Sequence, residues 1–405
     1  TIEQLVPANH LVRKLDAAID FSFIYPLVEN LYSQFGRPSI DPVVLFKMTM
    51  IQYVFGIRSM RQTIKEIETN VAYRWFLGFG FHTEVPHFST FGKNYLRRFE
   101  NTDVFEQIFY CILKEIVEEG LLSADHIFID STHVKASANK RKFDKKMVRK
   151  ETRAYEAKLQ EELNIDREKN GKKPFPKEKF EREEFKEIKE STTDPESGYY
   201  VKDERTKQFA YSFHAATDER GFVLGAIVTP GNIHDSHILQ PLVEKVIEKV
   251  KKPLAVAADA AYKTPAITNF LLENQMLPVL PYTRPKTKDG FFRKHDYVYD
   301  EHNDCYICPN DQTHSYFTTT KEGYRQFKSN PTICANCPFL KQCTESKNHT
   351  KLIQRHIWEA YVEEAEHLRH HEEIKLIYAK RKETIERVFA AMNLKKLATW
   401  TWQGA

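Results

Sequence analysis

The chain of 405 residues is too long for one small core, so we expect two or three domains. Its formal net charge is only +4, which is too small to indicate nucleic-acid binding by itself. Such a function must be argued from where the charges lie. No apolar run approaches the roughly 18 residues that span a bilayer, and the first residues, TIEQLVPANH, show no signal pattern, so we expect a cytoplasmic protein with no membrane partner.

An all-helical domain is predicted over residues 1–120. In DPVVLFKMTMIQYVFG, Asp41 is the expected N-cap and Gly56 the expected stop of one helix. A second helix is expected over SMRQTIKEIETNVAYRWF with Ser59 as its cap, and a third is expected to start near Ser89.

Basic side chains recur at helical spacing on the second and third of these helices: Arg58, Arg61 and Lys65, then Lys93, Arg97 and Arg98. Two solvated helix faces would explain this spacing. A helical module that lays basic faces on DNA phosphates explains it equally well, so both interpretations stay open at this point.

Two apolar runs in the middle of the chain end on a single acid. Asp130 follows HIFI, and Asp259 follows VAA. Sites collect at the carboxyl ends of strands in open sheets, and an unpaired carboxylate there is costly to desolvate. A divalent cation offsets this cost, and oxygen ligands suit Mg²⁺ or Mn²⁺. Either acid alone fits a turn or a helix cap better, but the pair, in its order along the chain, favours a metal site.

The order of the expected elements predicts an α/β domain over residues 121–283, with a mixed, RNase H-like sheet flanked by helices. A strand with Asp130 is followed by an insert, a two-strand hairpin, a helix and a strand with Asp259. In an RNase H-like sheet the first and fourth strands lie side by side. The two acids would therefore face each other across one cleft.

A third acid would come from C-terminal helices, which we predict over residues 355–405. Glu386, in TIERVF, is the best candidate because Ile385 and Phe389 surround it with apolar side chains, so that it projects from a partly buried helix. Glu383, about one helical turn earlier, is the rival.

The insert after the first strand, residues 139–190, is dense in charge. Mixed charge at helical spacing is typical of an exposed helix, interrupted here around NGKKPFP, so we expect a solvated helical hairpin in its second half. Its first third is strongly basic and includes Lys140 and Arg141. Because this basic part lies beside Asp130 in the sequence, it is a candidate for contact with a polyanion.

Five of the six cysteines cluster in a Cys-rich insert predicted over residues 284–354, in the order Cys305-x2-Cys308, Cys334-x2-Cys337 and Cys343. In a cytosolic chain such pairs fit a four-thiolate structural zinc site better than disulfides. Free thiols in a loop domain are the alternative. The fifth cysteine leaves open which four would bind the metal.

At these residues the chain resembles the DDE transposases of bacterial insertion sequences. FIDSTHVKASANKRK, VAADAAYKTPA and RKETIERVFA are similar to the segments around the family's three acids, which the resemblance assigns to Asp130, Asp259 and Glu386. The segments GIRSMRQTIKEIETNVAYRWFLG, HFSTFGKNYLRRF and STTDPESGYYVKDERTKQFAYSFHAATDERGFVLGAIVTPGNIHDSH also match. The resemblance therefore covers nearly the whole chain.

The resemblance implies a DNA transposase that cuts and joins DNA at the ends of an insertion sequence. The three acids would hold two Mg²⁺ or Mn²⁺ ions that support strand hydrolysis and then transesterification. The partners would be double-stranded DNA, at terminal inverted repeats and at a target, and a second copy of the chain in a homodimer at the bacterial nucleoid. His133, Lys135 and Asn139 could then reach the scissile phosphate, although exposed loop residues explain them equally well.

Three further polar residues have a simpler explanation than metal binding. In NIHDSH, His234, Asp235 and His237 resemble ligands, but a loop that leads into a helix capped by Asp235 accounts for them. Asp194, in STTDP, resembles a family position with a structural or substrate-contacting role. We place it outside the catalytic set.

One departure from the family concerns the C-terminus. ERVFA runs directly into AMNLKKLATWTW without the stretch usual in between, and Asn393 stands where a basic residue is usual, with Lys395 and Lys396 following. Such an apparent internal deletion predicts, as the alternative, an impaired copy that acts only as a DNA-binding protein. A generic RNase H-like nuclease is a weaker hypothesis, because the helical module and the Cys-rich insert argue against it.

Overall fold

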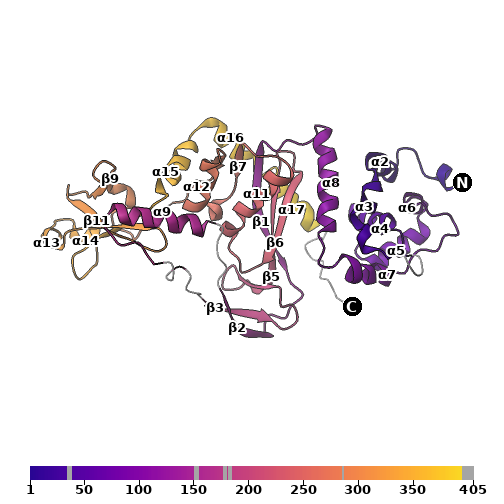
Figure 1. Cartoon of the computed structure of the whole chain (residues 1–405), viewed down its shortest axis with the longest axis horizontal. Helices are drawn as coiled ribbons and strands as arrows, with labels where there is room; N and C mark the ends of the chain where they lie inside the picture. Colours follow the sequence, from indigo (N-terminus) through magenta and orange to yellow (C-terminus); the bar gives the residue numbers. More distant parts are fainter. Residues whose placement is uncertain (34–38, 150–154, 177–179, 181–184, 285–286, 395–405) are drawn as a thin grey trace. The chain divides into compact units, whose positions relative to one another are not determined.

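The computed structural model describes residues 1–33, 39–149, 155–176, 180, 185–284 and 287–394 (Figure 1). The chain forms two compact units. Thr1–Leu122 makes up most of the first, and Ser123–Ala391 makes up most of the second. No helix among the described residues is long and apolar enough to cross a membrane.

The first unit is helical, as predicted. Its helices are α1 (Ile2–Leu5), α2 (Leu11–Ala18), α3 (Ile24–Val28), α4 (Pro42–Val54), α5 (Met60–Thr69), α6 (Val71–Phe76), α7 (Phe88–Asn94) and α8 (Val104–Glu118). Asp41 caps α4 by accepting a hydrogen bond from the Val43 N–H at 2.7 Å. The core is built largely from α3, α4 and α5, whose buried apolar side chains include Ile24, Val28, Leu45, Met48, Ile51 and Ile67.

The predicted second helix is in fact two helices. Asn70 is extended, and its side chain accepts hydrogen bonds from the N–H groups of Ala72 and Tyr73, so it ends α5 and caps α6. The third helix starts at Phe88, next to Ser89 as expected, and His87 is its N-cap. The apolar spacing continues across Asn70, but a local side-chain cap decides the boundary.

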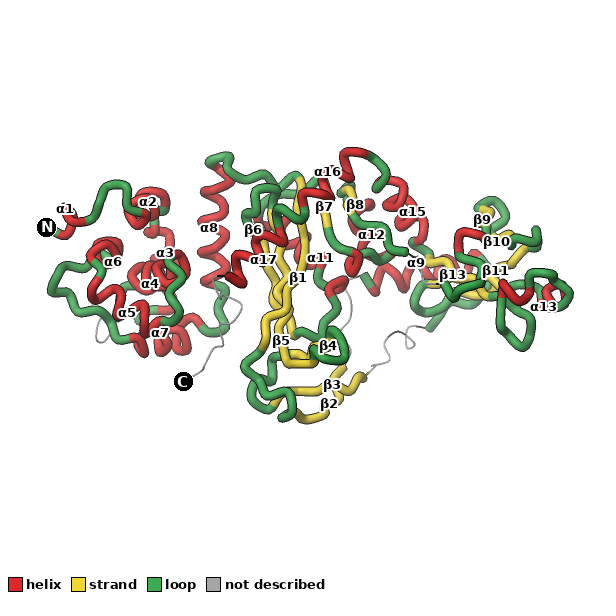
Figure 2. Tube along the Cα trace, turned by 180° about the vertical axis from the view of Figure 1, so that it is seen from behind, coloured by secondary structure: helices red, strands yellow, loops and turns green. Residues whose placement is uncertain are grey.

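The second unit is built on a mixed sheet, which Figure 2 shows in yellow. Part of it runs in the order β6 (Val223–Pro230), β5 (Lys207–Thr217), β1 (His126–Lys135), β7 (Ala255–Ala257) and β8 (Leu277–Val279). β1 is antiparallel to β5 and parallel to β7. Helix α11 (Leu239–Lys249) leads from β6 to β7, and α12 (Pro265–Glu273) leads from β7 to β8. This is the predicted RNase H-like order of strands.

The charged insert between β1 and β5 differs from the predicted helical hairpin. It contains β2 (Phe143–Arg149), α9 (Glu156–Lys169), β3 (Phe185–Ser191) and β4 (Gly198–Val201). β2 and β3 pair with each other in antiparallel fashion. The mixed charges meet across this ladder, where Lys146 lies 2.9 Å from Glu190. α9 is a helix that ends before NGKKPFP, as expected, but the strand β3 follows in place of a second helix, because the same alternation of signs serves cross-strand pairs as well as helical ones.

A second, antiparallel sheet of five strands occupies the Cys-rich region, in the order β13-β12-β11-β10-β9. The strands are β9 (Val298–Asp300), β10 (Cys305–Ile307), β11 (Thr313–Thr319), β12 (Tyr324–Lys328) and β13 (Leu352–His356). Between β12 and β13 lie the short helices α13 (Pro331–Cys334) and α14 (Leu340–Cys343). The described chain then ends with α15 (Glu359–Leu368), α16 (Glu372–Lys380) and α17 (Ile385–Leu394).

A buried acid joins this second sheet to the insert helix α9. Asp166, which is 6% exposed, accepts hydrogen bonds from Thr319 Oγ1 at 2.6 Å and from Arg325 Nε at 2.7 Å. The same guanidinium lies 3.5 Å from the more exposed Asp304. Because the Asp166 carboxylate is withdrawn from water, removing one partner of this pair leaves an uncompensated charge.

We expect Asp166→Asn to lower the free energy of unfolding by about 3 kcal/mol, because Arg325 then loses its buried counter-charge. The matched change Asp304→Asn should cost less than about 1 kcal/mol, because that carboxylate is partly solvated. Denaturant unfolding followed by circular dichroism measures both values. Equal losses in the two variants would show that Asp166 does not fasten α9 to the sheet.

Candidate active site

The parallel pairing of β1 with β7 brings two acids to matching positions. The ladder ends at the pair Phe128–Ala257, and Asp130 and Asp259 each lie two residues beyond it. The two acids therefore emerge next to each other where β7 ends. Asp259 then caps a short 3₁₀ turn, η5 (Ala260–Tyr262), by accepting a backbone N–H bond at 2.9 Å.

Asp130 lies within β1 rather than at its end, which corrects the predicted strand end. The fully buried part of the strand, Ile127–Ile129, stops at Asp130. The strand nevertheless continues to Lys135, because β5 pairs with it up to that residue. Asp130 is thus a mid-strand acid at the point where β7 no longer covers one edge of β1.

A cationic side chain links Asp130 to Glu386. Arg381, between α16 and α17, donates a hydrogen bond from Nη2 to Asp130 Oδ2 at 2.6 Å. Its Nη1 lies 3.9 Å from Glu386 Oε1. The Arg381 side chain is 11% exposed, and that of Glu386 is 49% exposed. One buried guanidinium therefore lies between an acid of the sheet and an acid of α17.

Apolar contacts hold α17 in place. Ile385 is fully buried, and Phe389 packs edge-on against Phe213 of β5 with ring centroids 6.4 Å apart. Glu386 projects from this anchored turn toward Arg381. Glu383, the rival candidate, is exposed in the turn before α17. The structure therefore connects Glu386, rather than Glu383, to Asp130.

Burial dominates the electrostatics of Asp130. It raises the pKa of this carboxyl above the ordinary value; the Arg381 guanidinium opposes the rise, and the charges of Asp259 and Asp235 add to it. Like charges in a poorly solvated place repel one another. The site consequently favours a bound cation, and Arg381 supplies one positive charge.

Asp235 is a further acid near this site, and its predicted role as a helix cap is wrong. His234 is the N-cap of the 3₁₀ turn η4 (Asp235–His237) and accepts a hydrogen bond from the Ser236 N–H at 3.2 Å. Asp235 is the first residue of that turn, which packs against η5. The polar run NIHDSH was the available signal, but its spacing does not show which side chain caps.

His214 of β5 lies behind Asp235 and was not expected at the site. Its ring is fully buried, with Nδ1 3.8 Å from Asp235 Oδ1 and Nε2 3.1 Å from Thr229 Oγ1. Burial lowers the pKa of His214 to about 4, although Asp235 opposes this effect, so the ring is neutral at pH 7. A histidine inside an apolar strand carries no local signal of such a contact.

The basic residues predicted to contact DNA are all exposed: Arg58, Arg61, Lys65, Lys93 and Arg97 in the first unit, and Lys135, Lys140 and Arg141 in the second. Arg61 also lies over the Phe88 ring at 4.4 Å. Arg98 differs, because it is half-buried over the Tyr32 ring at 4.4 Å. Packing therefore accounts for Arg98, whereas the exposed residues remain available to phosphates.

Other polar residues that the sequence singles out make structural contacts. The His133 ring stacks on Tyr200 with centroids 3.7 Å apart. Asn139 accepts a hydrogen bond from the Arg141 N–H at 3.0 Å and so shapes the turn before β2. Asp194 accepts a hydrogen bond from the Tyr211 hydroxyl at 2.6 Å. None of these contacts requires a substrate.

No group of three or more His, Cys, Asp or Glu side chains in the described part of the chain is already arranged to hold a metal ion. The six cysteines are free thiols. At the acids, however, the donors are carboxylate oxygens, which suit Mg²⁺ or Mn²⁺. The position of Arg381 between Asp130 and Glu386 also shows that a positive charge is accommodated there. The residues present thus fit a divalent cation.

Two family models match the chain. One, described as a transposase domain (DUF772), matches residues 1–97, and the other, described as a transposase DDE domain, matches residues 307–404. The second match includes Glu386 and runs across the apparent junction, where Lys395 and Lys396 lie outside the described residues. Comparisons with curated proteins and with solved structures found no match.

In the absence of divalent ions, we expect Arg381→Gln to lower the free energy of unfolding at pH 7 by about 2–3 kcal/mol, because it leaves the Asp130 carboxylate buried and unpaired. The loss should largely disappear in an Asp130→Asn background, which a double-mutant cycle measures. Lys382→Gln, at the exposed neighbouring position, is the control and should change stability little.

The same pair should respond to pH in a defined direction. Because burial raises the pKa of Asp130 and Arg381 opposes that rise, the pKa should rise further in Arg381→Gln. A protonated Asp130 needs no counter-charge, so the stability difference from the parent chain should be present at neutral pH and shrink as pH falls through this pKa. A difference that is constant with pH would exclude a charge pair.

Proposed function

Since the chain belongs to the insertion-sequence DDE transposases, we propose that it cuts and joins DNA at the ends of its own element by hydrolysis and transesterification of phosphodiester bonds. The observation that carries this proposal is the in-register pairing of β1 with β7, which sets Asp130 beside Asp259. Arg381 ties the third acid, Glu386, to the same place.

In the proposed mechanism, Asp130, Asp259 and Glu386 would hold two Mg²⁺ or Mn²⁺ ions. Such ions, when bound, activate the attacking oxygen and stabilise the leaving one. Asp130 and Asp259 both follow a buried ladder, and this ladder fixes how far apart the two acids lie. Glu386 has an exposed side chain on an anchored helix, and it completes the site once Arg381 gives way. Arg381 balances the charge of Asp130 at other times.

Hydrolysis and strand transfer use the same three acids. In the first step a water oxygen bonds to phosphorus while the bond to the DNA 3′-oxygen breaks. In the second step the freed 3′-hydroxyl oxygen bonds to a phosphorus of the target strand while the bond from that phosphorus to the target's own 3′-oxygen breaks, which leaves a 3′-hydroxyl on the target. The chain forms no covalent bond to DNA, so no Ser or Tyr nucleophile is required.

Exposed basic side chains supply the proposed DNA contacts. Arg58, Arg61, Lys65, Lys93 and Arg97 of the first unit would bind phosphates of the terminal repeats. Three more basic residues follow Asp130 along β1 and the turn after it: Lys135, Lys140 and Arg141. This position suits contacts with the phosphates of the DNA strand that is cut. A homodimer that pairs two element ends, acting at the nucleoid in the bacterial cytoplasm, completes the proposal.

The alternative function is that of an impaired copy that binds DNA without cutting it. It rests on the apparent junction after Phe389 and on Asn393, which lies in α17. The anchoring of α17 and the link from Glu386 to Arg381 favour the active enzyme. A chain that binds an element end but fails to nick it with Mn²⁺ would establish the alternative.

We expect Asp130→Asn, Asp259→Asn and Glu386→Gln each to reduce Mg²⁺-dependent nicking of an element-end duplex by about a thousandfold or more. Each change removes a carboxylate that would hold the metal ions, whose charge stabilises the transition state by several kcal/mol. Affinity for the same duplex in Ca²⁺ should stay close to that of the parent chain. Glu383→Gln is the matched control and should nick normally. Equal losses of binding and nicking would argue against a metal role.

We expect Lys65→Gln and Arg97→Gln each to weaken binding to any duplex and to reduce the slope of log affinity against log salt by about one, because each removes one phosphate contact. Lys14→Gln, an exposed change on α2 of the same unit, should leave the slope unchanged. Fluorescence anisotropy over a range of salt concentrations measures the slopes. An unchanged slope in both variants would place DNA on another surface.

A further inference from the structure

The cysteines of the second sheet are a cluster of metal-ligating side chains that the proposed DNA chemistry leaves unused. Cys308 and Cys343 both pack against the core of this sheet, which consists of Tyr297, Tyr306, Phe327 and Ile353. Cys343 Sγ lies 3.3 Å from the Tyr297 hydroxyl. Two thiols from segments far apart in the chain therefore pack against the same apolar cluster.

Two tight turns present the thiols. At the end of β10, the Asp311 N–H donates to the Cys308 carbonyl at 2.9 Å, and the Cys308 N–H donates to the Gln312 carbonyl at 2.9 Å. At the end of α13, the Cys337 N–H donates to the Cys334 carbonyl at 3.1 Å. A C-x2-C turn of the second kind is the usual half of a four-thiolate zinc site.

Cys305 points away from this group. It lies at the start of β10 (Cys305–Ile307), next to Tyr306, and neighbouring residues in a strand point to opposite faces. Tyr306 belongs to the core that Cys308 packs against. Burial raises the pKa of Cys305, and the charges that add to the rise are Asp300 and Asp304 rather than other thiols.

The surroundings of Cys308 and Cys343 bring a further thiol near and offer a positive charge. Cys334 lines the same pocket as Gln312, whose carbonyl accepts the hydrogen bond from the Cys308 N–H. Lys351 Nζ donates to the Cys343 carbonyl at 2.9 Å. A lysine at this place offsets the negative charge that four thiolates around one divalent ion would leave.

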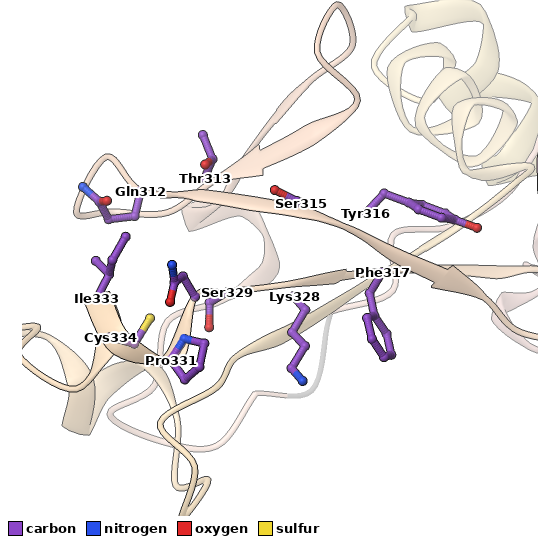
Figure 3. A pocket seen from close by; sticks show the side chains of 11 residues that line it. Gln312, Thr313, Ser315, Tyr316, Phe317, Lys328, Ser329, Pro331, Ile333 and Cys334 are labelled. Carbon is purple, nitrogen blue, oxygen red and sulfur yellow. The ribbon is translucent and has the colours of Figure 1, made fainter. Parts of the chain in front are cut away.

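We propose that Cys308, Cys334, Cys337 and Cys343 bind one structural zinc ion and that Cys305 takes no part. The side chains are not yet converged, since no three of them are arranged for a metal among the described residues, so they must turn on binding. Figure 3 shows Cys334 beside Ile333 and Pro331 at one end of a pocket of about 420 Å³, which leaves it room to turn. The ion would fasten the turn after β10 to the α13–α14 segment.

The test compares Cys343→Ser and Cys334→Ser with the matched change Cys305→Ser in the full chain, purified with zinc and dialysed. Elemental analysis should find about one zinc per chain in the parent and in Cys305→Ser, and almost none in the other two. Chelation should lower the melting temperature of the parent chain and of Cys305→Ser only.

A second measurement avoids any failure of the variants to fold. Cobalt added to the metal-free parent chain should give the absorption of a tetrahedral thiolate site, and zinc should remove it. A parent chain that holds no zinc and shows no such absorption overturns the proposal. Loss of zinc in Cys305→Ser, with retention in Cys343→Ser, overturns the assigned ligands. DNA nicking plays no part in these readouts, so they are independent of the proposed function.

Discussion

The parallel ladder between β1 and β7 is the constraint on which the acid cluster depends. It pairs only three residues of each strand, but Ile127, Phe128 and Val256 within it are fully buried. A slip of one residue would turn every side chain of one strand to the opposite face. The apolar core thus protects the register, and the register sets Asp130 next to Asp259.

Placing acids beside that core costs stability, and the contacts of Arg381 show how the cost is contained. Its guanidinium bonds to Asp130 and approaches Glu386, yet its buried Nε has no hydrogen-bond partner among the described residues. A guanidinium with an unsatisfied donor is held less firmly than a fully paired one. Such partial pairing suits a guanidinium that must later give way to metal ions, because a complete hydrogen-bond network around Arg381 would compete with those ions for the acids.

The sequence predicts the central fold well because its signals are local there. The apolar runs that end on Asp130 and Asp259, and the two-strand hairpin and helix between them, each specify one element, and their order defines the sheet. The insert is different, because mixed charge satisfies a strand ladder and a helix alike. Arg381 is different again, since nothing in a run of Lys and Arg singles out the one that the fold buries against Asp130.

The cysteines show that a spacing has meaning only together with the backbone that carries it. Cys305-x2-Cys308 and Cys334-x2-Cys337 have the same spacing, and from sequence they are equivalent halves of one site. In the structure the second pair closes a turn after a helix. The first pair begins in a strand, where Cys305 and its neighbour Tyr306 of the core point to opposite faces. Cys343, the cysteine without a partner in the sequence, takes the place beside Cys308 instead. The fold of β10 therefore changes which four thiols can share an ion, although the number of candidate ligands stays the same.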